Sequence, residues 1–305
     1  MFDIAFIGHV CRDEIVPFGG KPAVTPGSAV LCGAAAAGRI GARTAVVTRM
    51  NPADDEIVKP LRAIGVKVHV TPTEVTTFAR VVHPSENVDE RRLYVMRDAG
   101  PLTMKDVPRG FKTRILHLAG ISDHEFSLAF LHDLKASGFH LSVDMQSFVR
   151  VIGPGREIVF SDVPAKQEIA AMMDVVKLDV VEAEILTGTR DLEKAARIIS
   201  DWGAREVLIT EKAGATLAAG GQVFHEAFTN RSQAGRTGRG DTTISAYLCR
   251  RQTHSPEESL RFAAALVSIK MERPGPFSGT LEDVERSTTS RRMCSCFWNP
   301  RSRRR

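Results

Sequence analysis

One stretch late in the chain combines residue types that suit the binding and transfer of a phosphoryl group. Residues 235–241 read Gly-Arg-Thr-Gly-Arg-Gly-Asp, followed by an apolar run typical of a helix. The first N–H groups of a helix have no partner within it, and the helix dipole favours negative charge there. Gly238 and Gly240 would let a phosphate approach these groups. Asp241 beside them could accept the proton of an attacking hydroxyl.

Asp241 has a second interpretation on local grounds. Aspartate is among the preferred N-cap residues, so its carboxylate could simply cap the following helix. The residues alone leave the catalytic and the capping interpretations equally open. Two other phosphate-binding motifs do not fit, because the loop lacks the lysine of Gly-x-x-x-x-Gly-Lys-Ser/Thr and the third glycine of Gly-x-Gly-x-x-Gly.

Further carboxylates follow short apolar runs elsewhere in the chain. Asp13 comes after the first such run, and Asp179 and Glu182 follow the run Val175–Leu178. A carboxylate accepts strong hydrogen bonds from vicinal hydroxyls, and two oxygen ligands suit Mg²⁺, which keeps most of its waters. The alternatives are a solvated loop acid at Asp13 and the usual preference of helix starts for acids at the other two positions.

The elements that must position these residues alternate along the chain. Short apolar runs predict buried strands at Ile4–Gly8, Thr44–Thr48, Ile115–Leu118, His140–Val143, Val175–Leu178 and Val207–Thr210. Amphipathic stretches predict helices at Ser28–Ile40, Asp54–Ile64, Glu125–Ala136, Leu192–Trp202 and Thr242–Arg251. Repeated strand–helix units indicate an α/β fold with a mostly parallel sheet, whose ligands bind beyond the carboxyl ends of the strands.

One region departs from this alternation. Thr76–His83 and Arg91–Arg97 alternate apolar and polar residues on either side of a polar turn. This pattern predicts an antiparallel hairpin with one solvated face, which could form a lid that projects from the main sheet.

These motifs together resemble the ribokinase-like sugar kinases, the phosphofructokinase B class. Residues 238–242 are similar to the Gly-Ala-Gly-Asp-Thr/Ser signature of that family, in which the glycines form an anion hole and the aspartate is the catalytic base. The resemblance covers nearly all of residues 1–284 in the family's order. It implies a ribokinase-like kinase domain with helices on both faces of the sheet and a small β lid from about 14–25 and 74–98.

The resemblance also implies roles for individual residues. Asp241 would be the base, Gly238, Arg239 and Gly240 the anion hole, and Asp13, Gly27 and Ser28 the binding site of the substrate hydroxyls. ATP would be bound by Lys177, Thr210, Gly214, Thr237 and Ala264. Glu182 and Asp179 would organise Mg²⁺ through water, and Val143–Gln146 is similar to a segment at the nucleotide side.

The implied activity is an ATP-dependent transfer of the γ-phosphate to a hydroxyl of a sugar, polyol or nucleoside. Gly235, Arg236 and Arg239 depart from the family pattern, and no asparagine follows the glycine near Leu31. These departures keep open an alternative, a non-catalytic regulatory protein that binds nucleotide or sugar on the same fold. The acceptor and the oligomeric state are open, although lids of this family often pair in homodimers.

The charge distribution bears on other classes of partner. The last 21 residues hold seven arginines and one glutamate, a net charge of +6, and because the whole chain carries +5, residues 1–284 carry −1. A nucleic-acid partner is therefore not indicated. Residues 285–305 lack periodicity and predict a basic extension, disordered or non-native, although an anion-binding arm is an alternative. Five cysteines, odd in number, and no apolar run of about 20 residues favour a cytoplasmic protein without a membrane partner.

Overall fold

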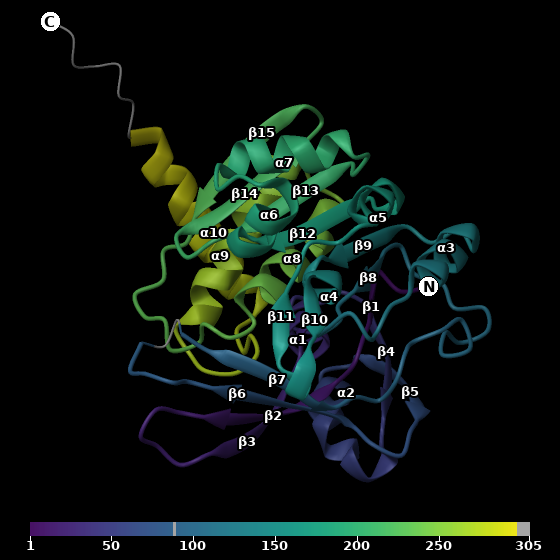
Figure 1. Cartoon of the computed structure of the whole chain (residues 1–305). Coiled ribbons are helices and arrows are strands. Elements are labelled where there is room, and N and C mark those ends of the chain that lie inside the picture. The colour runs from purple at the N-terminus through teal and green to yellow at the C-terminus, as the bar shows by residue number, and fades with distance from the viewer. Residues whose placement is uncertain (88–89, 298–305) are drawn as a thin grey trace, which may run out of the picture.

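The computed structural model describes residues 1–87 and 90–297. Its central feature is a mixed nine-stranded sheet (Figure 1). Its strands, in spatial order, are β15 (Gln222–Ala227), β14 (Gly214–Ala219), β13 (Glu206–Thr210), β12 (Val175–Asp179), β9 (Leu141–Asp144), β8 (Leu116–Leu118), β1 (Ile4–Ile7), β4 (Thr44–Met50) and β5 (Lys67–Pro72). The neighbours from β13 to β5 pair in parallel, and β14 and β15 are antiparallel. The predicted α/β fold is confirmed.

Helices cover both faces of this sheet, and each face has its own core. One core contains α1 (Ala29–Arg39), α2 (Lys59–Ala63), α8 (Arg239–Arg251), α9 (Pro256–Met271) and the start of α10 (Leu281–Phe297). The other contains α3 (Leu128–Ala136), α4 (Gln146–Val149), α5 (Lys166–Met172), α6 (Val180–Thr187) and α7 (Leu192–Asp201). In β13, Leu208 faces the first core, while Val207 and Ile209 face the second. Burial on both faces explains why the strands read as continuous apolar runs.

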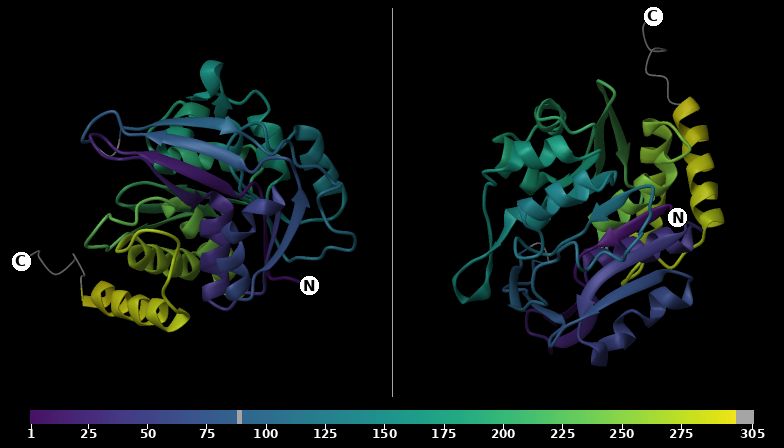
Figure 2. Two further views of the ribbon diagram at one scale, coloured as in Figure 1. Left: turned by 90° about the horizontal axis from the view of Figure 1, so that it is seen from below. Right: turned by 90° about the vertical axis from the view of Figure 1, so that its right-hand side faces the viewer.

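A separate four-stranded sheet forms the lid. It contains β3 (Ala23–Gly27), β2 (Cys11–Val16), β6 (Thr77–Val82) and β7 (Arg92–Arg97) in that spatial order. Figure 2 shows it as a layer apart from the main sheet. A small hairpin, β10 (Arg150–Ile152) and β11 (Ile158–Phe160), contacts it through an isolated bridge between Tyr94 and Glu157. The strands of the four-stranded sheet overlap the segments of about 14–25 and 74–98 that the resemblance implied, and its role as a lid remains a prediction.

Three predicted helices differ from the observed ones, and the one expected at Glu125–Ala136 begins three residues later, at Leu128. The prediction of one helix over Asp54–Ile64 is wrong, since a 3₁₀ helix η1 (Pro52–Ile57) precedes α2, which begins only at Lys59. Pro60 has no N–H to donate, so it fits the first turn of α2 but not the interior of one continuous helix. The helix expected at Thr242–Arg251 begins three residues earlier, at Arg239.

The end of the described chain also differs from the expected boundary at residue 284. Helix α10 runs from Leu281 to Phe297, and Val284 is fully buried against the first core. The basic residues 301–305 of the predicted extension lie outside the described residues. Another short 3₁₀ helix, η2 (Pro154–Arg156), completes the elements. None of the described helices has the length and apolar character needed to cross a membrane.

Candidate active site

The glycine-rich loop turns sharply into α8. Gly238 is the N-cap of this helix and has a left-handed backbone, with φ 80° and ψ 14°, which glycine adopts without steric cost. Asp241 is the third residue of the helix, within its first turn. The capping interpretation of Asp241 is therefore wrong. Its carboxylate lies instead beside the N-terminal N–H groups, where an anion is stabilised.

Helix α1 lies directly under this turn. A Cβ added to Gly238 would lie 2.4 Å from Sγ of Cys32 and 3.8 Å from a carboxylate oxygen of Asp241. Ser245 of α8 also donates to the carbonyl oxygen of Gly33 at 2.6 Å. Any side chain at position 238 would displace α8 from α1, so close helix packing requires this glycine as much as its backbone conformation does.

A buried ion pair joins the middle of strand β12 to the carboxyl end of its neighbour β9. Nζ of Lys177 in β12 donates to Oδ2 of Asp144, the last residue of β9, at 2.8 Å. These side chains are 4% and 0% exposed, so the two charges compensate each other away from water. A Cβ on Gly240 would lie 2.7 Å from the same Nζ. The ammonium group thus lies against the start of α8, next to Asp241.

Asp179 and Glu182 form a capping box at the start of α6. Oδ1 of Asp179 accepts from the N–H groups of Val181 and Glu182, both at 2.9 Å, and Oε2 of Glu182 accepts from the N–H of Asp179 at 2.8 Å. The helix-start interpretation is therefore correct for both acids. Glu182 has a further contact besides the capping box, because its Oε1 lies 3.5 Å from Nη2 of Arg150.

These residues, Asp144, Lys177, Asp179, Glu182 and Asp241, form what we call the carboxyl-edge cluster. Burial raises the pKa of Asp241, while Lys177 opposes this and Asp144 adds to it. Burial and Asp179 likewise raise the pKa of Glu182. Burial alone would lower the pKa of Lys177, but Asp144, Glu182 and Asp241 raise it above its ordinary value. A raised pKa makes Asp241 a stronger proton acceptor than a solvated aspartate.

The cluster fits a metal ion only in part. Among the described residues, no three His, Cys, Asp or Glu side chains are grouped so that they could hold a metal directly. Oδ1 of Asp179 already accepts two hydrogen bonds, whereas Oε1 of Glu182 has only the longer contact to Arg150. This donor set suits Mg²⁺ that keeps its waters and takes its remaining ligands from phosphate oxygens.

Asp13, Gly27 and Ser28 form a second group, the lid cluster. A Cβ on Gly27 would lie 1.8 Å from Oδ2 of Asp13, so this carboxylate rests against bare backbone. The sequence showed Asp13 only as a carboxylate after the first apolar run, and the structure places it within the lid strand β2. Burial raises the pKa of Asp13, and Cys11 opposes this by a hydrogen bond.

Ser28 is strained where the lid joins α1. Its φ is 133°, a region that non-glycine residues rarely adopt, and its Oγ accepts from the N–H of Leu31 at 3.2 Å as the N-cap of α1. Burial raises the pKa of the Cys32 thiol to about 12, and the charges of both Asp241 and Asp13 contribute to the increase. Both clusters therefore lie close to the first turn of α1.

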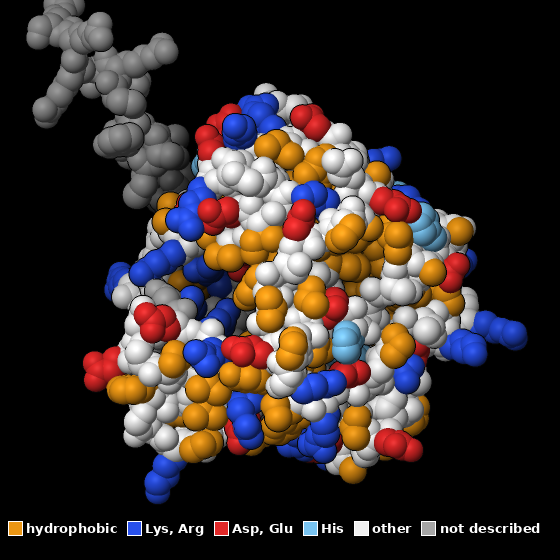
Figure 3. Space-filling view, in the orientation of Figure 1, with side chains coloured by type: hydrophobic (Ala, Val, Ile, Leu, Met, Phe, Trp, Pro, Cys, Tyr) orange, Lys and Arg blue, Asp and Glu red, His pale blue; other side chains and the backbone are white. Residues whose placement is uncertain are grey.

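One hollow on the face seen in Figure 3 is rich in cations. Figure 3 shows Lys and Arg side chains gathered in it, between the lid and the main body. The pKa of Arg91, which precedes β7, is lowered by burial and by three neighbouring guanidinium groups, although its side chain stays accessible to solvent. These groups belong to Arg150, Arg236 and Arg239. Concentrated positive charge of this kind binds polyanions strongly.

The remaining predicted residues are at or near the same edge. Thr210 ends β13 opposite Asp179, and its Oγ1 donates to the carbonyl oxygen of Leu178 at 3.4 Å. Gly214 begins β14, where a Cβ would lie 2.4 Å from the carbonyl oxygen of Glu226, so strand pairing alone requires this glycine. Thr237 precedes the N-cap of α8, and Ala264 is fully buried within α9. Their roles toward ATP remain predictions.

Sequence reasoning missed three cations of the site, Arg91, Arg150 and Lys270, and gave little weight to Asp144. Asp144 carried a usable signal, because it follows a predicted strand. Arg150 and Lys270 carried none, since they come from a short hairpin and from the end of a buried helix. Only the tertiary structure brings them to the residues of the glycine-rich loop.

Known proteins resemble the chain over almost its full length. The model of the pfkB family carbohydrate kinases matches residues 3–283. A cytidine kinase of Thermococcus kodakarensis is 26% identical over 217 residues, which cover 69% of this chain and 73% of that protein. A solved pyrophosphate-dependent kinase in the ribokinase family, complexed with a pyrophosphate analog and myo-inositol, is 33% identical, with a TM-score of 0.85 over 93% of this chain and 99% of that one.

A second solved structure shows the fold alone. The ribokinase of Arabidopsis thaliana, complexed with ribose and ATP, is 18% identical, with a TM-score of 0.74 over 94% of this chain and 98% of that one.

Proposed function

Because the chain belongs to the pfkB family of carbohydrate kinases, we propose that it transfers a phosphoryl group from pyrophosphate to a hydroxyl of a cyclic polyol. The observation that carries the reaction type is the position of Asp241, a partly buried carboxylate with raised pKa inside the first turn of α8, beside Lys177. A base and an anion-binding helix start at one point are what phosphoryl transfer to an alcohol requires.

The choice of pyrophosphate rests on the cationic hollow and on one comparison. The guanidinium groups of Arg91, Arg150, Arg236 and Arg239 lie near one another, and Arg150 also faces Glu182 of the carboxyl-edge cluster. Nε of Arg150 is buried without a hydrogen-bond partner among the described residues, and the 15% of its side chain that stays exposed would let the guanidinium donate to an incoming phosphate. A relative at 33% identity is pyrophosphate-dependent, and this similarity exceeds that to the ribokinase with ATP.

In the proposed reaction, Asp13 orients the acceptor and Asp241 activates it. Asp13 would accept hydrogen bonds from vicinal hydroxyls that lie against Gly27. The acceptor oxygen attacks the terminal phosphorus, its proton passes to Asp241, and the bridging P–O bond breaks to release phosphate. The N–H groups of Gly238 and Gly240 stabilise the charge on the transferred group.

Mg²⁺ would supply neutralisation of the donor's phosphate charge, held by Glu182 and Asp179 through water. The lid would exclude water that competes for the phosphoryl group.

Phe18 and Val24, which are 56% and 52% exposed, are on the lid, and we retain the prediction that the chain pairs through it.

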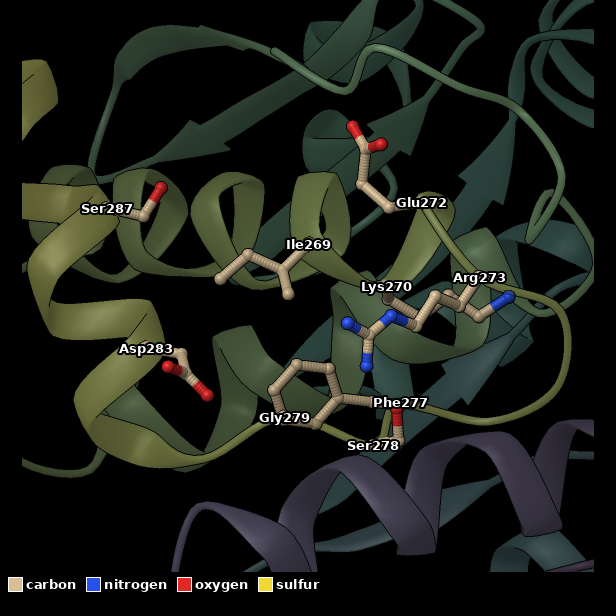
Figure 4. A pocket seen from close by; sticks show the side chains of 9 residues that line it. All are labelled: Ile269, Lys270, Glu272, Arg273, Phe277, Ser278, Gly279, Asp283 and Ser287. Carbon is tan, nitrogen blue, oxygen red and sulfur yellow. The ribbon is translucent and has the colours of Figure 1, made fainter.

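ATP is the second candidate donor, and one observation favours it. A cavity of about 420 Å³ lies between the end of α9 and the start of α10, with Ile269 and Phe277 in its wall (Figure 4). It adjoins Lys270, which contacts the glycine-rich loop. An apolar wall next to a phosphate site could take an adenine ring. Nucleosides are the second candidate acceptor, from the similarity to a cytidine kinase.

The test is a matrix of donors and acceptors in the presence of Mg²⁺. Pyrophosphate and ATP are each offered with cyclic polyols, sugars and nucleosides, and the phosphorylated product is identified by ³¹P NMR. Asp241→Asn is the matched control, since it keeps the size of the side chain and removes the base. Product formed with pyrophosphate, and lost in the control, is the expected result.

The other outcomes each select a different conclusion. Turnover with ATP alone would overturn the proposed donor and support the second candidate. No product from any pair, with either donor still bound by the folded protein, would support the regulatory alternative. Equal turnover by parent and Asp241→Asn would refute the role of Asp241 as base.

A further inference from the structure

The last turn of α9 holds the segment that leads into the glycine-rich loop. The N–H of Thr229 donates to Oγ of Ser268 at 2.9 Å, and the N–H of Gly235 donates to the carbonyl oxygen of Met271 at 2.9 Å. A Cβ on Gly235 would lie 1.9 Å from the carbonyl oxygen of Arg273. The loop therefore has almost no room to shift relative to the end of α9.

Lys270 extends from that turn into the loop itself. Its side chain is buried, with 3% of the residue exposed, and its Nζ donates to the carbonyl oxygens of Gly235 and Thr237. Carbonyl oxygens at the C-terminus of a helix carry partial negative charge, and the loop brings two more to the same place. An ammonium group satisfies this cluster of acceptors without needing a carboxylate.

The bond to Thr237 has a consequence for the next residue. In a planar trans peptide the carbonyl and the following N–H point in opposite directions. The carbonyl of Thr237 and the N–H of Gly238 belong to one such plane. Because Lys270 holds the carbonyl on the α9 side, the N–H of Gly238 must point away from α9. Gly238 is the N-cap of α8, so this N–H belongs to the turn that would receive the phosphoryl group.

We propose that Lys270 is a positioning residue that orients the Thr237–Gly238 peptide, so that the N–H of Gly238 donates to the transferred phosphoryl group. This inference rests on the proposed function. Lys270 also acts on Asp241 electrostatically, since its charge lowers the pKa of that carboxylate. One buried ammonium thus orients the anion hole and favours the charged form of Asp241, without contacting the substrate.

Lys270→Met tests the proposal, since methionine keeps most of the side-chain volume and loses the charge and the donors. We expect kcat to fall about 10²- to 10³-fold, the usual effect of losing one oxyanion donor, with the KM of the acceptor nearly unchanged. Lys270→Arg should recover part of kcat. Ser268→Ala is the matched control, because it removes another bond between α9 and the loop without touching the Thr237–Gly238 peptide, and kcat should stay close to that of the parent.

Chemical rescue separates positioning from general damage. Lys270 lines the 420 Å³ cavity, and Figure 4 shows it on the last turn of α9, with Asp283 of α10 across the opening. In Lys270→Ala this cavity would admit a small alkylammonium ion. We expect n-propylammonium chloride to raise kcat of this variant, and sodium chloride at equal ionic strength to leave it unchanged.

Hydrogen exchange of residues 235–241 provides a readout without turnover. We expect faster exchange in Lys270→Met than in Ser268→Ala. A folded Lys270→Met with parental kcat and parental loop exchange would overturn the proposal, and so would a low kcat that neither Lys270→Arg nor alkylammonium improves. If Lys270→Met does not fold, Lys270→Gln carries the same test. An inactive parent would count against the proposed function alone, and loop exchange would still decide the role of Lys270.

Discussion

The carboxyl-edge cluster and the lid cluster differ in whether a carboxylate shielded from water has a positively charged partner. Asp144 is fully buried and bonds to Lys177 at 2.8 Å. Asp13 is partly buried, and no lysine or arginine of residues 1–87 and 90–297 forms an ion pair with it. The first arrangement is complete without a ligand, whereas the second leaves hydrogen-bonding capacity for one. In the proposed function, the phosphoryl site would therefore be formed by the fold itself, whereas the acceptor site would be completed only by its substrate.

The largest expected effect is on catalysis at the carboxyl edge. Asp241→Asn should lower kcat by roughly 10²- to 10⁴-fold, because the proton acceptor is lost. The KM values should change little, since the amide fills the same space. Steady-state kinetics with the best donor and acceptor would measure this. A loss expressed only in KM would show that Asp241 binds substrate and is not the base.

Lys177→Met should break the ion pair that distinguishes the two clusters. We expect the free energy of unfolding to fall by about 3–5 kcal/mol, because Asp144 would be left buried without its counter-charge. Denaturant unfolding would measure the change. Combining it with Asp144→Asn should recover part of the loss, since the double variant has no uncompensated charge. Additive losses would contradict the pairing.

Arg150→Met should weaken donor binding without affecting the acceptor. Hydrogen bonds to charged groups contribute about 1.5–3 kcal/mol, so we expect the KM of the donor to rise about 10- to 100-fold. Lys166→Met is a matched control, because Lys166 forms its ion pair with Asp162 on the surface. An unchanged donor KM would place Arg150 outside the donor site.

Asp13→Asn should have the opposite profile. Replacing charge-assisted hydrogen bonds by neutral ones should raise the KM of the acceptor about five- to thirtyfold and leave the donor KM unchanged. Because burial raises the pKa of Asp13, its charged form is disfavoured in the folded protein, and the neutral variant should be at least as stable as the parent near pH 7. A clear loss of stability would remove the contrast with Asp144.

The smallest expected effect is a shift in the pH profile. The raised pKa of Asp241 means that kcat falls as the pH drops through this value, because the carboxylate becomes protonated. Lys270 lowers this pKa, so Lys270→Met should move the acidic limb to higher pH. Profiles of kcat against pH for both proteins would show the shift. An identical acidic limb would mean that Lys270 does not influence the pKa of Asp241.

The sequence alone determined the fold class, the predicted active-site loop and most strand ends. Continuous apolar runs are dictated by burial on both sheet faces, so β1, β4, β12 and β13 were predictable within a few residues. The carboxylates that follow such runs must meet at one edge when the strands are parallel. Asp179 and Glu182 could therefore be singled out from their places in the chain, and Asp241 from the glycine-rich loop that precedes it.

The tertiary structure decided which charges meet those carboxylates. Lys177 pairs with Asp144 from a neighbouring strand, Arg150 arrives from a small hairpin, and Lys270 reaches the loop from the end of α9. No local pattern encodes such contacts, because they depend on register and helix packing between segments far apart in sequence. The peptide plane at Thr237 is determined in the same way, by an ammonium group 33 residues further along the chain.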